Sequence, residues 1–180
     1  MNLQNEVREV IGVGVTSLRL GIAEHMARRV SDEESIAFDM AAFVTADVLD
    51  GAILREHDMD TPIRRVADGI VDHISIARVM TEVAKNNTTA QPYIGILATR
   101  AVIVGGLNLF HLVKTGEVTK GQNKQKATNL ATAVFGVVAA SGNKPLTHIT
   151  GSIAAAISLA TAPVHLQDVG MRHSGQYREL

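Results

Sequence analysis

The sequence predicts an all-α protein, a six-helix transmembrane bundle, and three observations support this fold class. Apolar segments rich in glycine and alanine alternate with short polar connections, and few runs show the strict alternation of a strand. Several segments approach the roughly 20 apolar residues that cross a bilayer, and they are apolar around most of the helix. Positive charges are distributed unevenly between alternate connections, as is typical of membrane proteins.

Six helices are expected, separated by ordinary start and stop signals. The stretch VSDEES offers Ser31 as an N-cap, KNNTTAQP ends a helix before Pro92, and SGNKP precedes the last helix. No linker rich in Pro, Ser or Gly divides the chain, so residues 1–180 are expected to form a single domain. The expected helices are 8–28, 34–56, 62–84, 91–115, 124–142 and 147–169.

A soluble helical bundle is the alternative to a membrane protein. The mean hydropathy of the whole chain is low, Trp is absent, and two Tyr and four Phe offer little for aromatic belts. The charge bias favours the membrane: with the N-terminus inside, the cytoplasmic segments hold ten Lys and Arg residues and the opposite connections mainly four, Arg28, Arg29, Lys85 and Lys144. We therefore expect an integral protein of a bacterial inner or plasma membrane with both ends inside.

Composition excludes several classes of function. The formal net charge of -1 gives no basic face, so nucleic acid is not an expected partner. The chain has no Cys, which excludes disulfides, thiolate metal sites and a cysteine nucleophile. Any metal must be held by oxygen or imidazole.

Four aspartates lie in the apolar sequence of the second and third expected helices. Asp47 and Asp50 are spaced i, i+3, and Asp68 and Asp72 are spaced i, i+4, so each pair shares one helix face. Antiparallel packing places both pairs at the same cytoplasmic depth, where four like charges repel unless cations lie between them. Oxygen-only clusters bind hard divalent ions. The alternative is that some of these acids are solvated residues at helix ends.

At these residues the sequence resembles the CDP-alcohol phosphatidyltransferases. The family signature is D-x-x-D-G-x-x-A-R, a spacer, and G-x-x-x-D-x-x-x-D, and six of its eight positions match here, including every carboxylate. VTSLRLG is similar to the family's T-x-x-R start, with Thr16 and Arg19, and NKQKAT to its G-K-x-K-T, with Lys124 and Lys126.

The resemblance implies a function. Family members transfer a phosphoalcohol group from a CDP-alcohol, usually CDP-diacylglycerol, to an acceptor hydroxyl and release CMP. Asp47, Asp50 and Asp68 would be the principal ligands of Mg²⁺ or Mn²⁺. Asp72 would be the general base and is also a candidate metal ligand. Gly51 would let the nucleotide approach the backbone, and Arg55 would contact phosphate.

Two positions depart from the signature: Leu54 replaces its Ala and Arg64 its second Gly. Either the nucleotide pocket is reshaped, with Arg64 contacting phosphate or base, or nucleotide use is altered or lost. The alternatives are therefore an inactive homologue acting as a binding or structural membrane protein, and an ion transporter, since acids within a membrane also mark conduction paths.

Other polar residues are candidates for the acceptor site. Arg19 and Arg100 lie in apolar helices, where a charge usually faces the interior of the bundle. With Lys124 and Lys126 they could bind a small polar or phosphorylated alcohol acceptor; a structural ion pair or an interfacial anchor is the alternative. The Gly105–Gly106 pair would suit a homodimer face, which the family commonly has.

Overall fold

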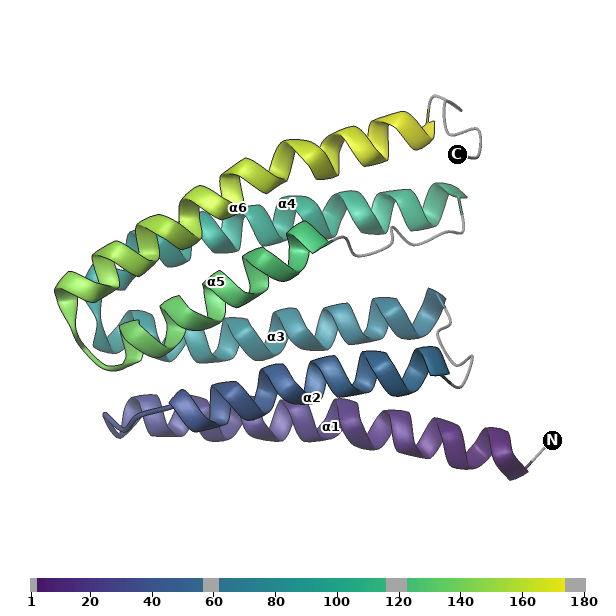
Figure 1. The fold of residues 1–180 in the computed structure, drawn as a ribbon, viewed down its shortest axis with the longest axis horizontal. Helices are drawn as coiled ribbons and strands as arrows, with labels where there is room; N and C mark the ends of the chain where they lie inside the picture. The colour runs from purple at the N-terminus through teal and green to yellow at the C-terminus, as the bar shows by residue number, and fades with distance from the viewer. Residues whose placement is uncertain (1–2, 57–61, 116–122, 174–180) are drawn as a thin grey trace. The chain divides into compact units, whose positions relative to one another are not determined.

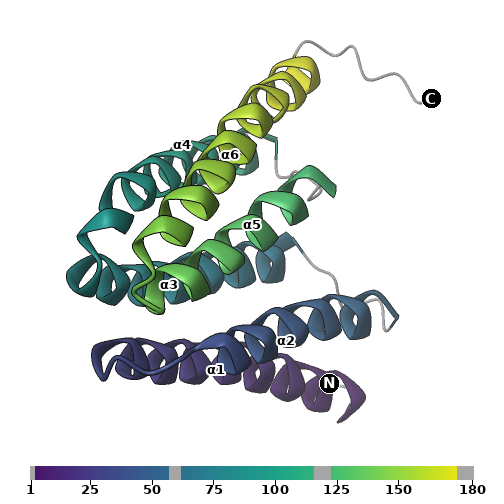
Figure 2. The ribbon, with the colours of Figure 1, turned by 60° about the vertical axis from the view of Figure 1, so that its left-hand side comes forward.

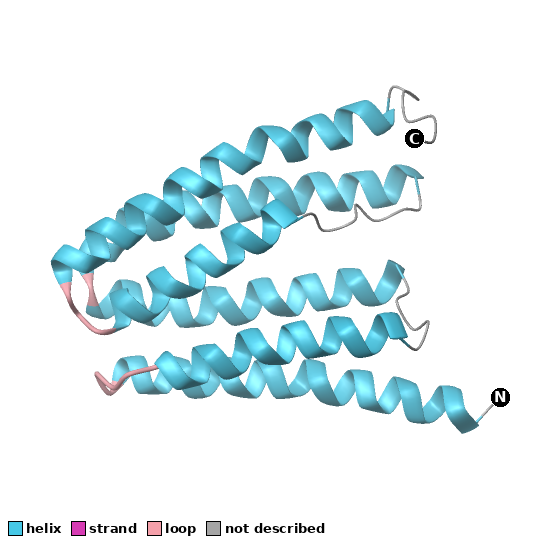
Figure 3. Cartoon of the chain, viewed as in Figure 1, coloured by secondary structure: helices cyan, strands magenta, loops and turns pink. Residues whose placement is uncertain are grey.

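A computed structural model describes residues 3–56, 62–115 and 123–173. These residues form six α-helices and one short 3-10 helix, without a strand (Figures 1 and 3), so the all-α prediction is confirmed. The chain divides into two compact units, Met1–Asn86 and Asn87–Leu180, here called the N-terminal and the C-terminal unit. The expectation of a single domain stays a prediction.

The N-terminal unit consists of α1 (Leu3–Ser31), α2 (Ala37–Glu56) and α3 (Pro62–Asn86). Successive helices run in opposite directions, and α1 packs against both of the others (Figures 1 and 2). One stripe of α1 is buried because its apolar residues recur at helical spacing. The buried apolar residues are Ala23, Met26, Ala27 and Val30 of α1, Met40 and Phe43 of α2, Val79, Met80 and Val83 of α3, and Ile36.

The C-terminal unit begins with the 3-10 helix η1 (Thr88–Ala90), followed by α4 (Gln91–Thr115), α5 (Asn123–Ala140) and α6 (Lys144–His173). Helix α6 packs against both α4 and α5. Its buried face is made of small residues such as Ala154, Ala155 and Ser158. Small side chains let helix backbones approach closely, as is common in membrane bundles.

The helix ends follow local sequence signals, with one correction. Ser31 is not the N-cap of the second helix: it is the last residue of α1, and its hydroxyl donates to Ala27 O (3.1 Å) and Glu82 (3.3 Å). Ser35 lies before α2 instead, and its Oγ accepts from the Ala37 N–H at 3.4 Å. Gly142 turns the chain between α5 and α6 with φ of +71°, a conformation that glycine adopts without strain.

Gly151 of α6 lies where the helix approaches the ring of Tyr93 on α4. A Cβ atom at this position would be 2.6 Å from the ring atoms Cδ2 and Cγ. We predict that Gly151→Ala lowers the free energy of unfolding by about 1–3 kcal/mol, because the ring or the helix must shift. Gly95→Ala is the control, since no heavy atom lies within 4 Å of the position that its new methyl group would take. Equal midpoints of thermal unfolding for the two variants would contradict this packing.

One described stretch, Thr88–His111, is long and apolar enough to cross a membrane. Only 11% of its apolar window is buried, and Val102, Leu109 and Val113 are exposed apolar residues of the same helix. An apolar helix buried in a soluble core would hide these side chains. The stretch therefore fits a lipid environment, and the expected six spans stay a prediction.

Candidate metal and phosphotransfer site

The aspartate motif lies on α2 and α3, which are consecutive in the chain. Asp47 precedes the end of α2 by nine residues, and Asp72 follows the start of α3 by ten. With a rise of about 1.5 Å per residue, Asp47 lies about 14 Å from the C-terminal end of α2 and Asp72 about 15 Å from the N-terminal end of α3. These are the two helix ends that the connection joins. Positions 50 and 68 lie about one turn nearer the connection. The backbone thus places the motif in two layers, one with positions 47 and 72 and one with positions 50 and 68.

Arg19 of α1 joins the two carboxylates of the first layer. Its Nη1 donates to Asp47 Oδ1 at 3.0 Å and to Asp72 Oδ1 at 2.7 Å. The Arg19 side chain is 1% exposed, whereas those of Asp47 and Asp72 are 49% and 31% exposed. A buried guanidinium is costly unless carboxylates compensate its charge. One residue from each half of the motif therefore converges on a single cation.

The other layer lies outside the described side chains. Asp50 and Asp68 are helical residues of α2 and α3 whose side chains the structure does not describe. The same holds for Gly51, Leu54, Arg55 and Arg64. Among the side chains that are described, no group of three or more His, Asp or Glu residues could hold a metal ion. The four-aspartate metal site consequently stays a prediction.

Comparison with known proteins identifies the family. The family model described as CDP-alcohol phosphatidyltransferase matches residues 13–164, a range that contains the complete aspartate motif. The chain belongs to the CDP-alcohol phosphatidyltransferase family. A search of curated proteins finds no match for the chain.

Membership in the CDP-alcohol phosphatidyltransferase family confirms several predictions. The family is a transferase family, so this chain is assigned to an enzyme class that transfers a phosphoalcohol group from a CDP-alcohol to an alcohol acceptor. It is a family of phospholipid biosynthesis and is membrane-associated. The match runs from α1 into α6 and so includes residues of both units.

A second arginine, Arg78 of α3, resembles Arg19 of α1 in its contacts but lies away from the aspartate motif. Arg78 donates from Nε to Glu24 of α1 at 3.0 Å and also pairs with Glu82 of its own helix. Its side chain is 40% exposed, so its ion pairs are partly solvated and contribute little to stability. Arg19 thus differs from Arg78 in being fully buried and in holding family motif residues.

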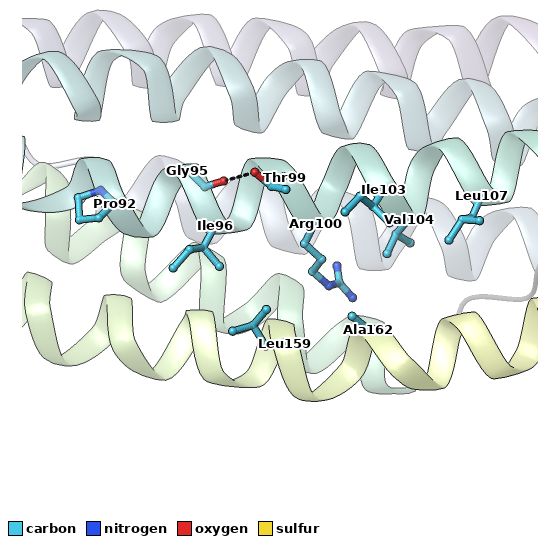
Figure 4. A pocket seen from close by; sticks show the side chains of 10 residues that line it. All are labelled: Pro92, Gly95, Ile96, Thr99, Arg100, Ile103, Val104, Leu107, Leu159 and Ala162. Carbon is cyan, nitrogen blue, oxygen red and sulfur yellow. Dashed lines mark hydrogen bonds between the residues drawn. The ribbon is translucent and has the colours of Figure 1, made fainter.

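Arg100, a candidate acceptor-binding residue, lies in the C-terminal unit. Its Nε donates to Ser158 O and its Nη2 to Thr161 Oγ1, both at 3.2 Å. It lines a cavity of about 440 Å³ between α4 and α6 that is otherwise mainly apolar (Figure 4). The other lining residues include Ile96, Ile103, Val104, Leu107 and Leu159. These contacts tie α4 to α6 through a buried guanidinium.

The remaining acceptor candidates are located only by their backbone. Lys124 and Lys126 lie in the first turn of α5, and their side chains are outside those described. Gly105 and Gly106 lie on α4, and a Cβ atom added to either would meet no heavy atom within 4 Å, so neither makes a close helix contact within the described chain. For Arg19 the alternative of a structural ion pair is confirmed, but its partners, Asp47 and Asp72, were not predicted; the only available signal was its position in the T-x-x-R stretch.

Proposed function

We propose that the protein transfers a phosphatidyl group from CDP-diacylglycerol to an acceptor hydroxyl and releases CMP. The observation that carries this proposal is the convergence of Asp47 and Asp72 on one cation in a chain that belongs to the family. In this reaction a bond forms between the acceptor oxygen and the phosphorus next to the lipid. The bond from that phosphorus to the bridging oxygen breaks, and CMP leaves with that oxygen.

Divalent cations fit the motif residues. The donors are all carboxylate oxygens, the ligands that Mg²⁺ and Mn²⁺ prefer. The contacts of Arg19 support the fit, since carboxylates from α2 and α3 already reach a common positive group. Asp47, Asp50 and Asp68, with Asp72, would hold the ions. Bound Mg²⁺ or Mn²⁺ would neutralise the pyrophosphate and stabilise CMP as the leaving group.

Asp72 is proposed as the general base. It would take the proton of the acceptor hydroxyl as that oxygen attacks phosphorus. Its side chain is 31% exposed, which leaves it accessible to an acceptor, while Arg19 fixes one of its oxygens. Gly51 would allow the nucleotide to approach α2, and Arg55 would contact a phosphate oxygen with its planar donors.

The acceptor is proposed to be a small polar or phosphorylated alcohol. Lys124 and Lys126 lie in the first turn of α5, where positive charge is unfavourable beside the helix dipole. A bound phosphate would offset both the side-chain charges and the dipole. Arg100 is the weaker candidate, because its guanidinium already donates to Ser158 and Thr161.

The enzyme is proposed to be integral to a bacterial inner or plasma membrane, with its site at the cytoplasmic face. The charge bias of the connections supports this orientation, and the exposed apolar face of α4 supports contact with lipid. A homodimer through the Gly105–Gly106 region is part of the proposal, since small residues without close neighbours in the described chain permit another helix to approach.

Substitutions of Arg64 distinguish an active enzyme from an inactive homologue. It lies in the first turn of α3, one helical turn before Asp68, so we place it at the mouth of the site. If it binds a phosphate, Arg64→Ala should weaken nucleotide or acceptor binding by about 1.5–3 kcal/mol, as for a charge-assisted hydrogen bond. Binding isotherms for CDP-diacylglycerol would measure this loss.

Arg64→Gly is the diagnostic second variant, because it restores the residue of the family signature. A gain of CMP release in this variant would contradict the phosphate-binding role and favour the inactive homologue. Unchanged activity in both variants would make Arg64 a membrane-interface anchor.

The experiment that tests the proposed function is a screen for CMP. Purified protein is incubated with CDP-diacylglycerol, Mg²⁺ and a panel of acceptors: glycerol phosphate, inositol phosphate, serine and a second lipid. We expect CMP release with at least one acceptor and none after EDTA. CMP release that is the same with and without EDTA would overturn the metal-dependent mechanism.

A further inference from the structure

The guanidinium of Arg19 lies between two residues of the proposed metal site, Asp47 and Asp72. Nη1 is within hydrogen-bond distance of both Asp47 and Asp72. This contact supplies one positive charge to a motif that contains four carboxylates. Like charges at this spacing destabilise the fold unless a cation compensates them.

We propose that Arg19 is an internal cation that stabilises the metal-free site and competes with the divalent ions for Asp47 and Asp72. The inference rests on the metal site of the proposed function. Arg19 is a positioning residue, since it acts through the aspartates and the proposal gives it no contact with substrate. It links α1 to α2 and α3 and so keeps the two halves of the motif together before a metal binds.

The burial of Arg19 determines how its charge acts on a bound metal ion. Because the side chain is 1% exposed, the guanidinium is held away from water beside the two carboxylates. A divalent ion bound by the same carboxylates would therefore lie close to a fixed positive charge. The repulsion lowers metal affinity, while the same charge holds the carboxylates together when metal is absent.

The test compares metal binding in wild type, Arg19→Gln and Arg19→Lys. Mn²⁺ is the probe, because the free ion can be counted by electron paramagnetic resonance. We expect Arg19→Gln to bind Mn²⁺ about tenfold more tightly or better, since removing one neighbouring positive charge relieves the repulsion. Arg19→Lys keeps the charge and should bind Mn²⁺ with nearly wild-type affinity. Without metal, Arg19→Gln should unfold at a lower temperature than wild type, and Mn²⁺ should raise its midpoint more.

Arg78→Gln is the matched control. Arg78 also pairs with a carboxylate of α1 and one of α3, but neither belongs to the motif. Its removal should leave Mn²⁺ affinity unchanged. All variants are purified in Mn²⁺ and then stripped with chelator, so that a variant that needs metal to fold is still obtained. Arg19→Gln that is folded with Mn²⁺ and unfolded without it would support the proposal.

Three results would overturn the inference. Unchanged or weaker Mn²⁺ binding in Arg19→Gln would show that the guanidinium does not compete, and the proposed function would stand. Failure of Arg19→Gln to fold even in Mn²⁺, while Arg78→Gln folds, would make Arg19 a structural residue that metal cannot replace. Absence of Mn²⁺ binding to the wild-type protein would remove this inference together with the metal site of the proposed function.

Discussion

Asp72→Asn is expected to reduce turnover by about 10²–10⁴-fold, the usual contribution of a positioned general base. Asn keeps the size of the side chain and most of its hydrogen bonding, but it cannot take the proton of the acceptor hydroxyl. Binding of the CDP-alcohol should therefore survive. Initial rates of CMP release give the turnover, and a binding isotherm with CDP-diacylglycerol gives the affinity.

His73→Gln is the control for Asp72→Asn. His73 is the next residue of α3, is exposed, and its Nδ1 lies 2.6 Å from Gly69 O within the helix. Its replacement should leave turnover unchanged. Equal losses of binding and turnover in Asp72→Asn would contradict the role of base and make Asp72 chiefly a metal ligand.

Asp47→Asn is expected to weaken metal binding by about a hundredfold, because carboxylate charge sets the affinity of oxygen-ligand sites over several decades. CMP release at a fixed low Mg²⁺ concentration should fall accordingly and recover in part at high Mg²⁺. The measurements are a Mn²⁺ titration and the Mg²⁺ dependence of CMP release.

Asp39→Asn provides the comparison for Asp47→Asn. Asp39 is also a carboxylate on α2 and accepts from Arg29 Nη1 at 3.1 Å, two turns before Asp47. Its replacement removes the same charge but should not change metal affinity. If both variants lost the same affinity, the effect would come from net charge rather than ligation, and Asp47 would not be a ligand.

The sequence predicted the helices well where the chain carries local signals. The ranges 91–115 and 62–86 agree with the expectation to within two residues, since Pro92 and Pro62 lie in the first turns of α4 and α3. The start of α6 was placed three residues late. Asn143 Oδ1 accepts from the Leu146 N–H at 3.1 Å, and this cap begins the helix at Lys144.

Contacts between residues that lie far apart in the sequence could not be predicted from local signals. Arg19 is 28 residues from Asp47 and 53 from Asp72, and no local pattern indicates which face of α1 will pack against α2 and α3. The contacts of Arg100 could not be predicted for the same reason. Its partners, Ser158 and Thr161, lie about 60 residues away in the sequence. The aspartate motif was visible because i, i+3 and i, i+4 spacing is itself a local signal.

The number of membrane spans depends on helices whose hydropathy is mixed. α1 and α3 carry Glu24, Arg78, Glu82 and Lys85. Arg78 pairs with Glu24 between the two helices, and the other ion pairs lie within one helix. Hydropathy counts each such residue as polar although its charge is compensated by a partner. Before its last turn, α4 carries only one Asp, Glu, Lys or Arg residue, the buried Arg100.

We propose that the aspartate motif uses divalent metal to release CMP from a CDP-alcohol. The most direct measurement is CMP release from CDP-diacylglycerol by chelator-treated protein, with the responsive acceptor, as Mg²⁺ is added back. We expect no CMP without metal, saturable recovery with Mg²⁺ in wild type, and no comparable recovery in Asp72→Asn. CMP release by the metal-free protein, or equal recovery in wild type and Asp72→Asn, would contradict it.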